Sequence, residues 1–237
     1  MKPHIGTAGW SIPRQVSDAF PGEGTHLQRY AARFDVAEIN SSFHRPHRRA
    51  TYERWAASVP DGFRFAVKIP KTITHQAKLV ECGALLAVFA EQVAGLREKR
   101  GPLLVQLPPS FAWPGDVAER FLDQLDGALG GQMVIEPRHP SWYAPEIDAL
   151  LSARRIARVA ADPPVPADAS EPGGWPRLRY YRLHGSPRTY WSSYTPEQIA
   201  GHAARLLGES WTIYDNTASG AAAGNAVELQ AVLGLKR

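Results

Sequence analysis

The sequence contains 237 residues, of which 44% are hydrophobic and 21% charged, with a net charge of +4 and one cysteine. A chain of this length can bury a full core without disulfides or a structural metal, and one cysteine with no CxxC, CxxH or HExxH spacing predicts a reduced, cytoplasmic protein. The first residues lack the apolar stretch of a signal peptide, and no run of about 18 apolar residues occurs, so we expect neither secretion nor membrane spanning.

Short runs of β-strand character alternate with amphipathic helical patterns along the whole chain. The predicted strands are 5–8, 36–40, 64–69, 103–107, 133–136, 157–161, 179–184 and 212–214. The predicted helices are 26–34, 49–58, 84–97, 116–125, 145–154, 196–207 and 220–233. Two of them begin with Pro followed by Glu, at 145 and 196, where a fixed φ and a negative charge suit the first helical turn.

Eight such units in about 250 residues are typical of an α/β fold of the TIM-type (β/α)8 barrel class, which predicts a single domain over residues 1–237. An open, doubly wound sheet is the alternative fold, but the GxGxxG and GxxxxGK[ST] motifs are absent. Segment 162–177 contains five prolines and a Gly-Gly pair, a composition that excludes a long helix. We expect this Pro-rich loop to replace or shorten the sixth helix, or to cover the barrel mouth.

Polar residues follow the predicted strands, at the end where barrels of this class carry their sites. Because side chains alternate along a strand, the apolar residues predict one face and the polar residues the other. The residues expected to point inward are Glu38, Asn40, Lys68, Gln106, Glu136, Arg138, Asp162, Arg182, His184 and Asn216. Their acids and bases balance, so they form either a neutral salt-bridge network that fills the barrel or a functional site, and we favour the site.

Several motifs resemble the YecE-like family, which is domain of unknown function number seventy-two. They are GTAGW at 6–10, EINSSF at 38–43, FRFAVK at 63–68 with ITH at 73–75, GPLLVQLPPS at 101–110, EPRHPSW at 136–142, RLHG at 182–185 and DNT at 215–217. The resemblance extends in order from residue 5 to residue 233. It implies a TIM-type barrel, in agreement with the strand count, and no established reaction.

The candidate catalytic residues are Glu38, Glu136 and His184, as proton-transfer groups, and Lys68. Lys68 would act as a Schiff-base amine if its pKa were depressed, but we expect the nearby carboxylates to keep it protonated, which favours an electrostatic anchor. The candidate ligand-binding residues are Asn40, Gln106, Arg138, His139, Asp162, Arg182, Asn216, Trp10, Trp142 and Arg45. The two tryptophans would either stack on a sugar or base or seal the rim.

Three functional hypotheses follow. The favoured one is an enzyme of lyase, isomerase or hydrolase type that acts on a small anionic, phosphorylated or sugar-like metabolite, since barrels often bind phosphate near a turn such as 215–221. The second is nucleic-acid or nucleotide binding by a basic rim containing Arg45, Arg48 and Arg49. The third is a metal-dependent phosphodiester hydrolase with a divalent metal held by Glu136, Asp162, His184 or His139. No organic cofactor and no particular oligomeric state are predicted.

Overall fold

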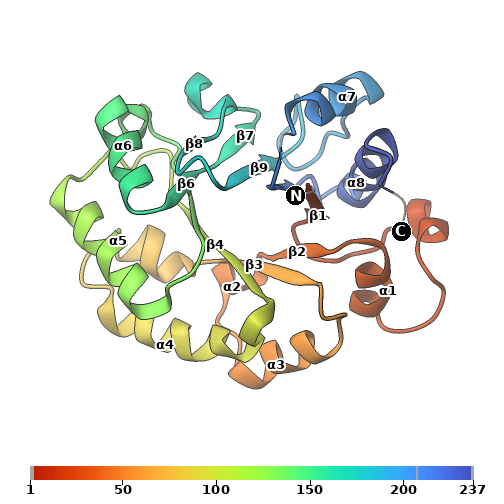
Figure 1. The fold of residues 1–237 in the computed structure, drawn as a ribbon, viewed down its shortest axis with the longest axis horizontal. Coiled ribbons are helices and arrows are strands. Elements are labelled where there is room, and N and C mark those ends of the chain that lie inside the picture. The colour runs from red at the N-terminus through yellow and green to blue at the C-terminus, as the bar shows by residue number, and fades with distance from the viewer. Residues whose placement is uncertain (1–2, 207, 236–237) are drawn as a thin grey trace.

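The computed structural model describes residues 3–206 and 208–235, in which strands and helices alternate along the chain (Figure 1). The strands are β1 (His4–Thr7), β2 (Val36–Ile39), β3 (Arg64–Lys68), β4 (Arg100–Gln106), β5 (Met133–Glu136), β6 (Ile156–Arg158), β7 (Ala160–Asp162), β8 (Gly173–Gly174), β9 (Arg179–Leu183) and β10 (Ser210–Tyr214). The helices are α1 (His26–Arg33), α2 (Ser41–His44), α3 (Arg49–Ala57), α4 (Gly83–Val93), α5 (Asp116–Leu129), α6 (Pro145–Ala153), α7 (Pro196–Arg205) and α8 (Ala221–Val232). Each predicted strand and helix has a counterpart among these elements.

Four local details differ from the sequence prediction. The sixth strand is divided into β6 and β7 at Val159, and a short additional helix, α2, begins after a single residue, Asn40, beyond β2. The predicted helix 84–97 ends at Val93 and continues as a 3-10 turn in which Arg97 has a left-handed φ of 52°. The predicted helix 196–207 ends at Arg205, and its last expected residue, Leu207, lies outside the described residues.

The strands belong to two sheets that consist almost entirely of parallel pairs. One sheet has the order β1-β10-β9-β7, and the other has the order β2-β3-β4-β5-β6-β8, in which the β6–β8 pair is antiparallel. The sheets meet at two places: Ala8 forms a parallel bridge with Glu38, and β6 leads into β7 through Val159, whose N–H donates to Ile135 O (2.8 Å). The helices lie around the outside of the strands (Figure 1).

Two groups of buried apolar residues follow from the alternation of side chains along each strand. The outer group packs the strands against the helices and includes Ile39, Val67 and Leu107. The inner group is contributed by both sheets and consists of Val36, Ala66, Leu104, Val134, Ala157, Val159, Leu178, Tyr180, Trp211 and Ile213. Because the period of a strand is two, the residue two positions beyond each inner residue faces the same way, which determines the side chains of the site.

The Pro-rich loop returns the chain from β7 to β9 without a long helix. It contains a 3-10 turn, Ala167–Ser170, and the two-residue strand β8, which pairs with Ala157 and Arg158 of β6. A Cβ on Gly174 would lie 2.5 Å from Ile156 O, and its φ is +64°, so this close approach requires glycine. The loop therefore replaces the helix expected between the sixth and seventh predicted strands, and its β8 part lies along the sheet edge beside Ala157 and Arg158.

Candidate functional site

Arg182, on β9, is fully buried at the centre of a group of charged side chains at the carboxyl ends of the strands. Its guanidinium donates to Glu38 from Nε (3.1 Å) and Nη2 (2.7 Å), to Glu136 from Nη1 (2.6 Å) and to Asp215 from Nη2 (2.8 Å). Glu38 also accepts a hydrogen bond from Tyr180 OH (2.9 Å). A buried carboxylate is tolerated when it is paired and hydrogen-bonded, so one guanidinium serves as the counter-ion of three acids.

The imidazole of His184 lies between two of these carboxylates. Its Nε2 is 3.2 Å from Glu136 Oε1, and its Nδ1 is 3.1 Å from Asp215 Oδ2. Burial alone would lower the pKa of His184, but Glu136 and Asp215 outweigh this effect and raise the pKa above its ordinary value of 6.5. The pKa of Glu136 is held well below 4.5, since Arg182, Arg138 and His184 outweigh the opposing effect of burial. The geometry therefore favours an imidazolium between two carboxylates.

Lys68, at the end of β3, lies beside this group without joining its ion pairs. Lys68 is 7% exposed, and its Nζ lies 4.1 Å from the centre of the Phe43 ring. No carboxylate in the described part of the chain is within salt-bridge distance of this amine. Ser42 Oγ donates to the backbone O of Lys68 (2.6 Å), which attaches α2 to β3 and places the next residue, Phe43, over the amine.

The pKa of Lys68 is lower than the sequence analysis assumed, although at pH 7 most of the amine is still protonated, as expected. Burial and the charge of Arg182 lower the pKa from 10.5 to about 8, and the opposing effect of Glu38, Glu136 and Asp215 is not enough to restore it. The physical reason is that Arg182 is already paired with these three acids, so their negative charge does not act on Lys68 alone.

Further polar and aromatic side chains lie next to this buried group. Arg138 donates to Glu136 Oε1 from Nε (3.0 Å) and Nη2 (2.8 Å), and its side chain is 20% exposed. His75 is half-buried, and burial together with the charges of Lys68 and Arg138 lowers its pKa. Tyr190 has a left-handed φ of 69° and lies edge-on to His184, with ring centroids 5.6 Å apart. These groups place one guanidinium and two aromatic rings beside the buried ion pairs.

Asn40, directly after β2, contributes an amide to the same end of the strands. Its Nδ2 donates to Asp215 Oδ1 (3.3 Å), which fixes the orientation of the amide. Its Oδ1 is buried and has no hydrogen-bond partner among the described residues. A buried acceptor without a partner costs free energy, and a donor on a bound ligand would satisfy it.

A family model described as "Protein of unknown function DUF72" matches residues 4–237. The chain belongs to the DUF72 family. Curated relatives include the UPF0759 protein YecE of Escherichia coli K12, 31% identical over 166 residues and 67% of this chain, and the UPF0759 protein YunF of Bacillus subtilis 168, 24% identical over 149 residues and 60% of this chain. These alignments cover 58% and 52% of the two relatives, so the chain matches little more than half the length of each.

Solved DUF72 structures share the fold of this chain. A crystal structure of a DUF72 family protein from Enterococcus faecalis V583 has a TM-score of 0.84 with 22% identity and covers 100% of this chain and 97% of its own. Another from Thermotoga maritima MSB8 has a TM-score of 0.77 with 22% identity and covers 99% of this chain and 100% of its own. These comparisons show an α/β fold with sheets rich in parallel pairs over the whole described chain.

Most of the charged residues selected in this DUF72 sequence come together in the structure. The site contains Glu38, Asn40, Lys68, Gln106, Glu136, Arg138, Arg182 and His184, as the alternation of side chains predicts. Each of five side chains stands two positions beyond an inner apolar residue of its own strand: Glu38 after Val36, Lys68 after Ala66, Gln106 after Leu104, Glu136 after Val134 and Arg182 after Tyr180. The roles assigned to them remain predictions.

The expected inward orientation is wrong for Asp162 and Asn216. Asp162 Oδ2 lies 3.6 Å from Nε2 of His202, on α7, and Asn216 Nδ2 donates to Asn225 on α8 (2.8 Å) and to Ser192 O (2.9 Å). Val159 and Ile213 belong to the inner group, so the residues in phase with them are Ala161 and Asp215. Asp215 therefore occupies the place in the site that was assigned to Asn216.

Trp142, Trp10 and His139 were predicted to contact a ligand, but their side chains contact other residues of the chain. Trp142 is fully buried and donates from Nε1 to Phe111 O (2.9 Å), so it is not available to a ligand. Trp10 packs edge-on to Trp55, with ring centroids 5.0 Å apart. His139 Nδ1 accepts from Ser141 N (3.2 Å) and caps the 3-10 turn Pro140–Tyr143. These residues stabilise local structure.

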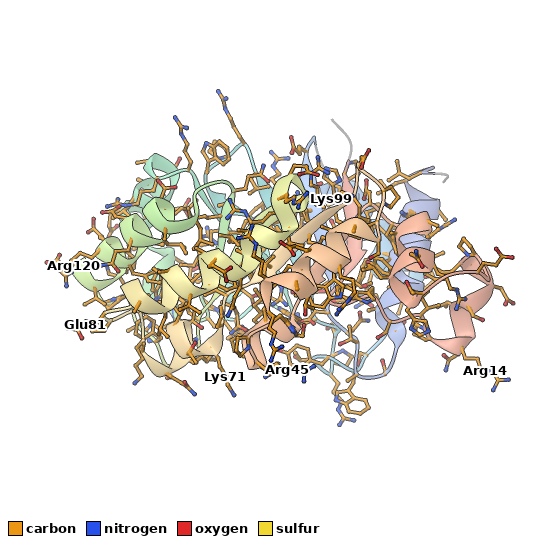
Figure 2. The ribbon with its side chains drawn as sticks, turned by 90° about the horizontal axis from the view of Figure 1, so that it is seen from below. Arg14, Arg45, Lys71, Glu81, Lys99 and Arg120 are labelled. Carbon is orange, nitrogen blue, oxygen red and sulfur yellow. The ribbon has the colours of Figure 1, made fainter. Side chains whose placement is uncertain are left out.

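Arg45 is exposed at the same edge of the molecule as Lys71, opposite Lys99, as Figure 2 shows. This edge carries the carboxyl ends of the strands, because Lys71 follows β3 and Lys99 precedes β4. Arg49, the third arginine of the expected basic rim, is paired with Glu53 (3.1 Å) and lies 3.7 Å from Glu91. Part of the basic charge of the rim is therefore neutralised.

Sequence reasoning missed Asp215, Tyr180, Phe43, His75 and Tyr190. The signal for Asp215 and Tyr180 was available in the alternation around Ile213 and Arg182. Phe43, His75 and Tyr190 lie in connections between strands, where the alternation of side chains along a strand gives no prediction.

Among the residues that the structure describes, no three His, Cys, Asp or Glu side chains are arranged to hold a metal ion, and no helix is both long and apolar enough to cross a bilayer.

Proposed function

We propose that this DUF72 chain binds a small anionic metabolite, phosphorylated or sugar-like, at the carboxyl ends of its strands and performs acid–base chemistry on it. The observation that carries the proposal is the charge balance around Lys68. Glu38, Glu136 and Asp215 are matched by Arg182, Arg138 and the imidazolium of His184. The protonated form of Lys68 has no counter-ion in this set, and an anionic ligand would supply one.

The proposed roles follow from the partners of each group. Arg182 binds three carboxylates, and Glu38 is bonded to Arg182 and Tyr180, so these two residues act as the support that orients the other groups. Lys68 and Arg138 would contact the anion, and Asn40 and Gln106 would orient it through their amides. Glu136 and His184 share a hydrogen bond (3.2 Å) along which a proton can move, so they are the proposed proton-transfer pair.

This proposal includes the finer fold, in which the two sheets form one closed (β/α)8 barrel as a single domain. Support comes from the Ala8–Glu38 bridge at one junction, from the direct continuation of β6 into β7 at the other, and from an inner apolar group shared by both sheets. In such a barrel the carboxyl ends of all strands would surround one mouth, which is where the charged residues converge.

The alternative functions have weaker support. Nucleic-acid binding would need a continuous basic rim, and Arg49 is engaged by Glu53 and Glu91. A metal-dependent hydrolase would need Asp162 near Glu136 and His184, whereas Asp162 faces α7. An anionic ligand therefore remains the function that the geometry supports best.

The test is ligand-dependent stabilisation with inorganic phosphate and malonate as probes at constant ionic strength. A ligand at tenfold its Kd adds about 1.4 kcal/mol, which raises the Tm of a protein of this size by about 3–5 °C. We expect this shift in the natural protein and its loss in Lys68→Met and Arg138→Gln. Arg120→Gln, which removes an exposed charge on α5, is the matched control and should retain the shift. The absence of a shift with both anions, or an unchanged shift in Lys68→Met, would contradict the proposal.

A further inference from the structure

Two buried lysines in this chain have opposite surroundings. Lys99, 6% exposed, donates from Nζ to Ala56 O (2.9 Å) and Val59 O (2.7 Å) and lies 3.7 Å from Asp61. Lys68 is equally buried, yet in the described part of the chain its Nζ has the face of Phe43 and neither a hydrogen-bond acceptor nor a carboxylate. Burying an amine without such partners is costly, so the structural explanation that suffices for Lys99 does not apply to Lys68.

We propose that Lys68 is a nucleophilic amine that condenses with the carbonyl group of the bound anion to form a Schiff base, so the substrate class is a small anionic aldehyde or ketone. This inference rests on the proposed function, because the anion must first bind beside Arg138 and Lys68.

The chemistry balances without an oxidant or a reductant. The neutral amine of Lys68 adds to the carbonyl carbon, a C–N bond forms, and a proton moves from nitrogen to the carbonyl oxygen to give a carbinolamine. The hydroxyl group then takes a proton from the solvent and leaves as water, its C–O bond breaks, and the nitrogen lone pair forms the C=N bond of a protonated Schiff base. This iminium withdraws electrons from the adjacent carbon, which is the function that such amines serve in lyases and isomerases.

The surroundings of Lys68 make the neutral amine available. The charged groups that face it are Arg182 from β9 and the acids Glu38, Glu136 and Asp215 from β2, β5 and β10, and the sum of burial and charge lowers its pKa to about 8. About a tenth of the molecules then carry a neutral amine at pH 7, a few hundredfold more than for an ordinary lysine.

His75 is a positioning residue in this proposal, because it packs against the Phe43 ring that faces Lys68. Its ring meets the edge of the Phe43 ring, with centroids 5.0 Å apart, and the same Phe43 ring faces Lys68 Nζ at 4.1 Å. Its Nδ1 is 2.8 Å from Thr74 Oγ1. Burial, together with the charges of Lys68 and Arg138, lowers the pKa of His75 and favours its neutral form.

The experiment is reductive trapping followed by peptide mapping. The protein is incubated at pH 7 with sodium cyanoborohydride and glycolaldehyde phosphate or glyoxylate, and uncharged glycolaldehyde is the control probe. We expect a reduced adduct at Lys68 that forms at least about tenfold faster than at the exposed Lys78, with no adduct at Lys99, and a smaller preference with the uncharged probe. Lys68 labelling that is no faster than Lys78 labelling with both anionic probes would overturn the inference.

Lys68→Arg separates the two proposals, since arginine keeps the cation and remains protonated at neutral pH. Phosphate-dependent stabilisation that persists in this variant while trapping at position 68 disappears supports both proposals. Stabilisation of the natural protein without trapping contradicts the Schiff base and leaves anion binding intact. The loss of both measurements in the natural protein contradicts both proposals.

Discussion

Arg182 joins β9 to two strands, β2 and β5, with which β9 forms no backbone ladder. Its hydrogen bonds extend from β9 to Glu38 on β2 and Glu136 on β5, which belong to the other sheet, and to Asp215 directly after β10. Every one of these carboxylates is buried, so the guanidinium is both a structural cross-link and the support for the candidate site. The same side chain therefore connects the stability of the fold with the charge of the site.

Removal of this guanidinium should destabilise the protein strongly. Arg182→Gln leaves three buried carboxylates without their main counter-ion, and we expect the free energy of unfolding in urea to fall by about 3–5 kcal/mol. Arg120→Gln, at a side chain that is 67% exposed, should change it by less than about 0.5 kcal/mol. Equal losses in the two variants would show that the buried network does not stabilise the fold.

Strand β1 approaches β2 closely at Gly6. A Cβ at this position would lie 2.2 Å from Val36 O and 3.0 Å from Tyr30 OH, which itself donates to Val36 O (3.1 Å). The junction between the two sheets at Ala8 and Glu38 follows two residues later. A side chain at Gly6 would therefore force apart the two strands that connect the sheets.

We expect Gly6→Ala to lower the free energy of unfolding by at least about 2 kcal/mol, because the neighbouring backbone has to move. Gly127→Ala is the matched control, since Gly127 lies inside α5 and a Cβ there would meet no atom within 4 Å. The free energy of unfolding of the control variant should rise by about 0.5–1 kcal/mol, because alanine favours a helix more than glycine does. Urea denaturation of both variants measures these changes in the free energy of unfolding. If Gly6→Ala stabilised the protein, the close approach of β1 to β2 would be contradicted.

The sequence predicted the elements well because their signals are local. Strand boundaries agree within a few residues, and the alternation of side chains selected Glu38, Glu136 and Arg182, which form the network. Asp162 and Asn216 were assigned wrongly because the period was counted from the ends of the strands and not from the inner residues Val159 and Ile213. The partial deprotonation of Lys68 was not predictable, since it depends on burial and on distances to charges from four different strands.

For the whole molecule, the buried carboxylates couple folding to pH. The pKa of Glu136 is held well below 4.5, and that of Asp215 below 3.8, so both groups bind protons more readily in the unfolded chain. Their contribution to stability is fully present above these ordinary values and is lost as the pH falls through the lowered pKa values. The loss of stability at acidic pH therefore measures the protonation of the carboxylates in the candidate site.

We expect the free energy of unfolding of the natural protein to fall steadily as the pH decreases from 5 to 3. Glu136→Gln should be less stable at pH 7 and should show a shallower decrease over the same range, because one of the coupled carboxyls is absent. Glu23→Gln, at an exposed position, should retain the natural slope. Urea denaturation at intervals of pH measures the slopes, and identical slopes for all three proteins would refute the coupling.

The position of Arg182 in the chain has a consequence for synthesis. Glu38 and Arg182 are separated by 144 positions, and β1 pairs with β10, the last strand that the structure describes. At about 5–20 residues per second, a ribosome needs on the order of ten seconds to pass from the acid to its cation. During that interval Glu38 has no guanidinium to pair with, so the charged centre assembles only after β9 and Asp215 have been made.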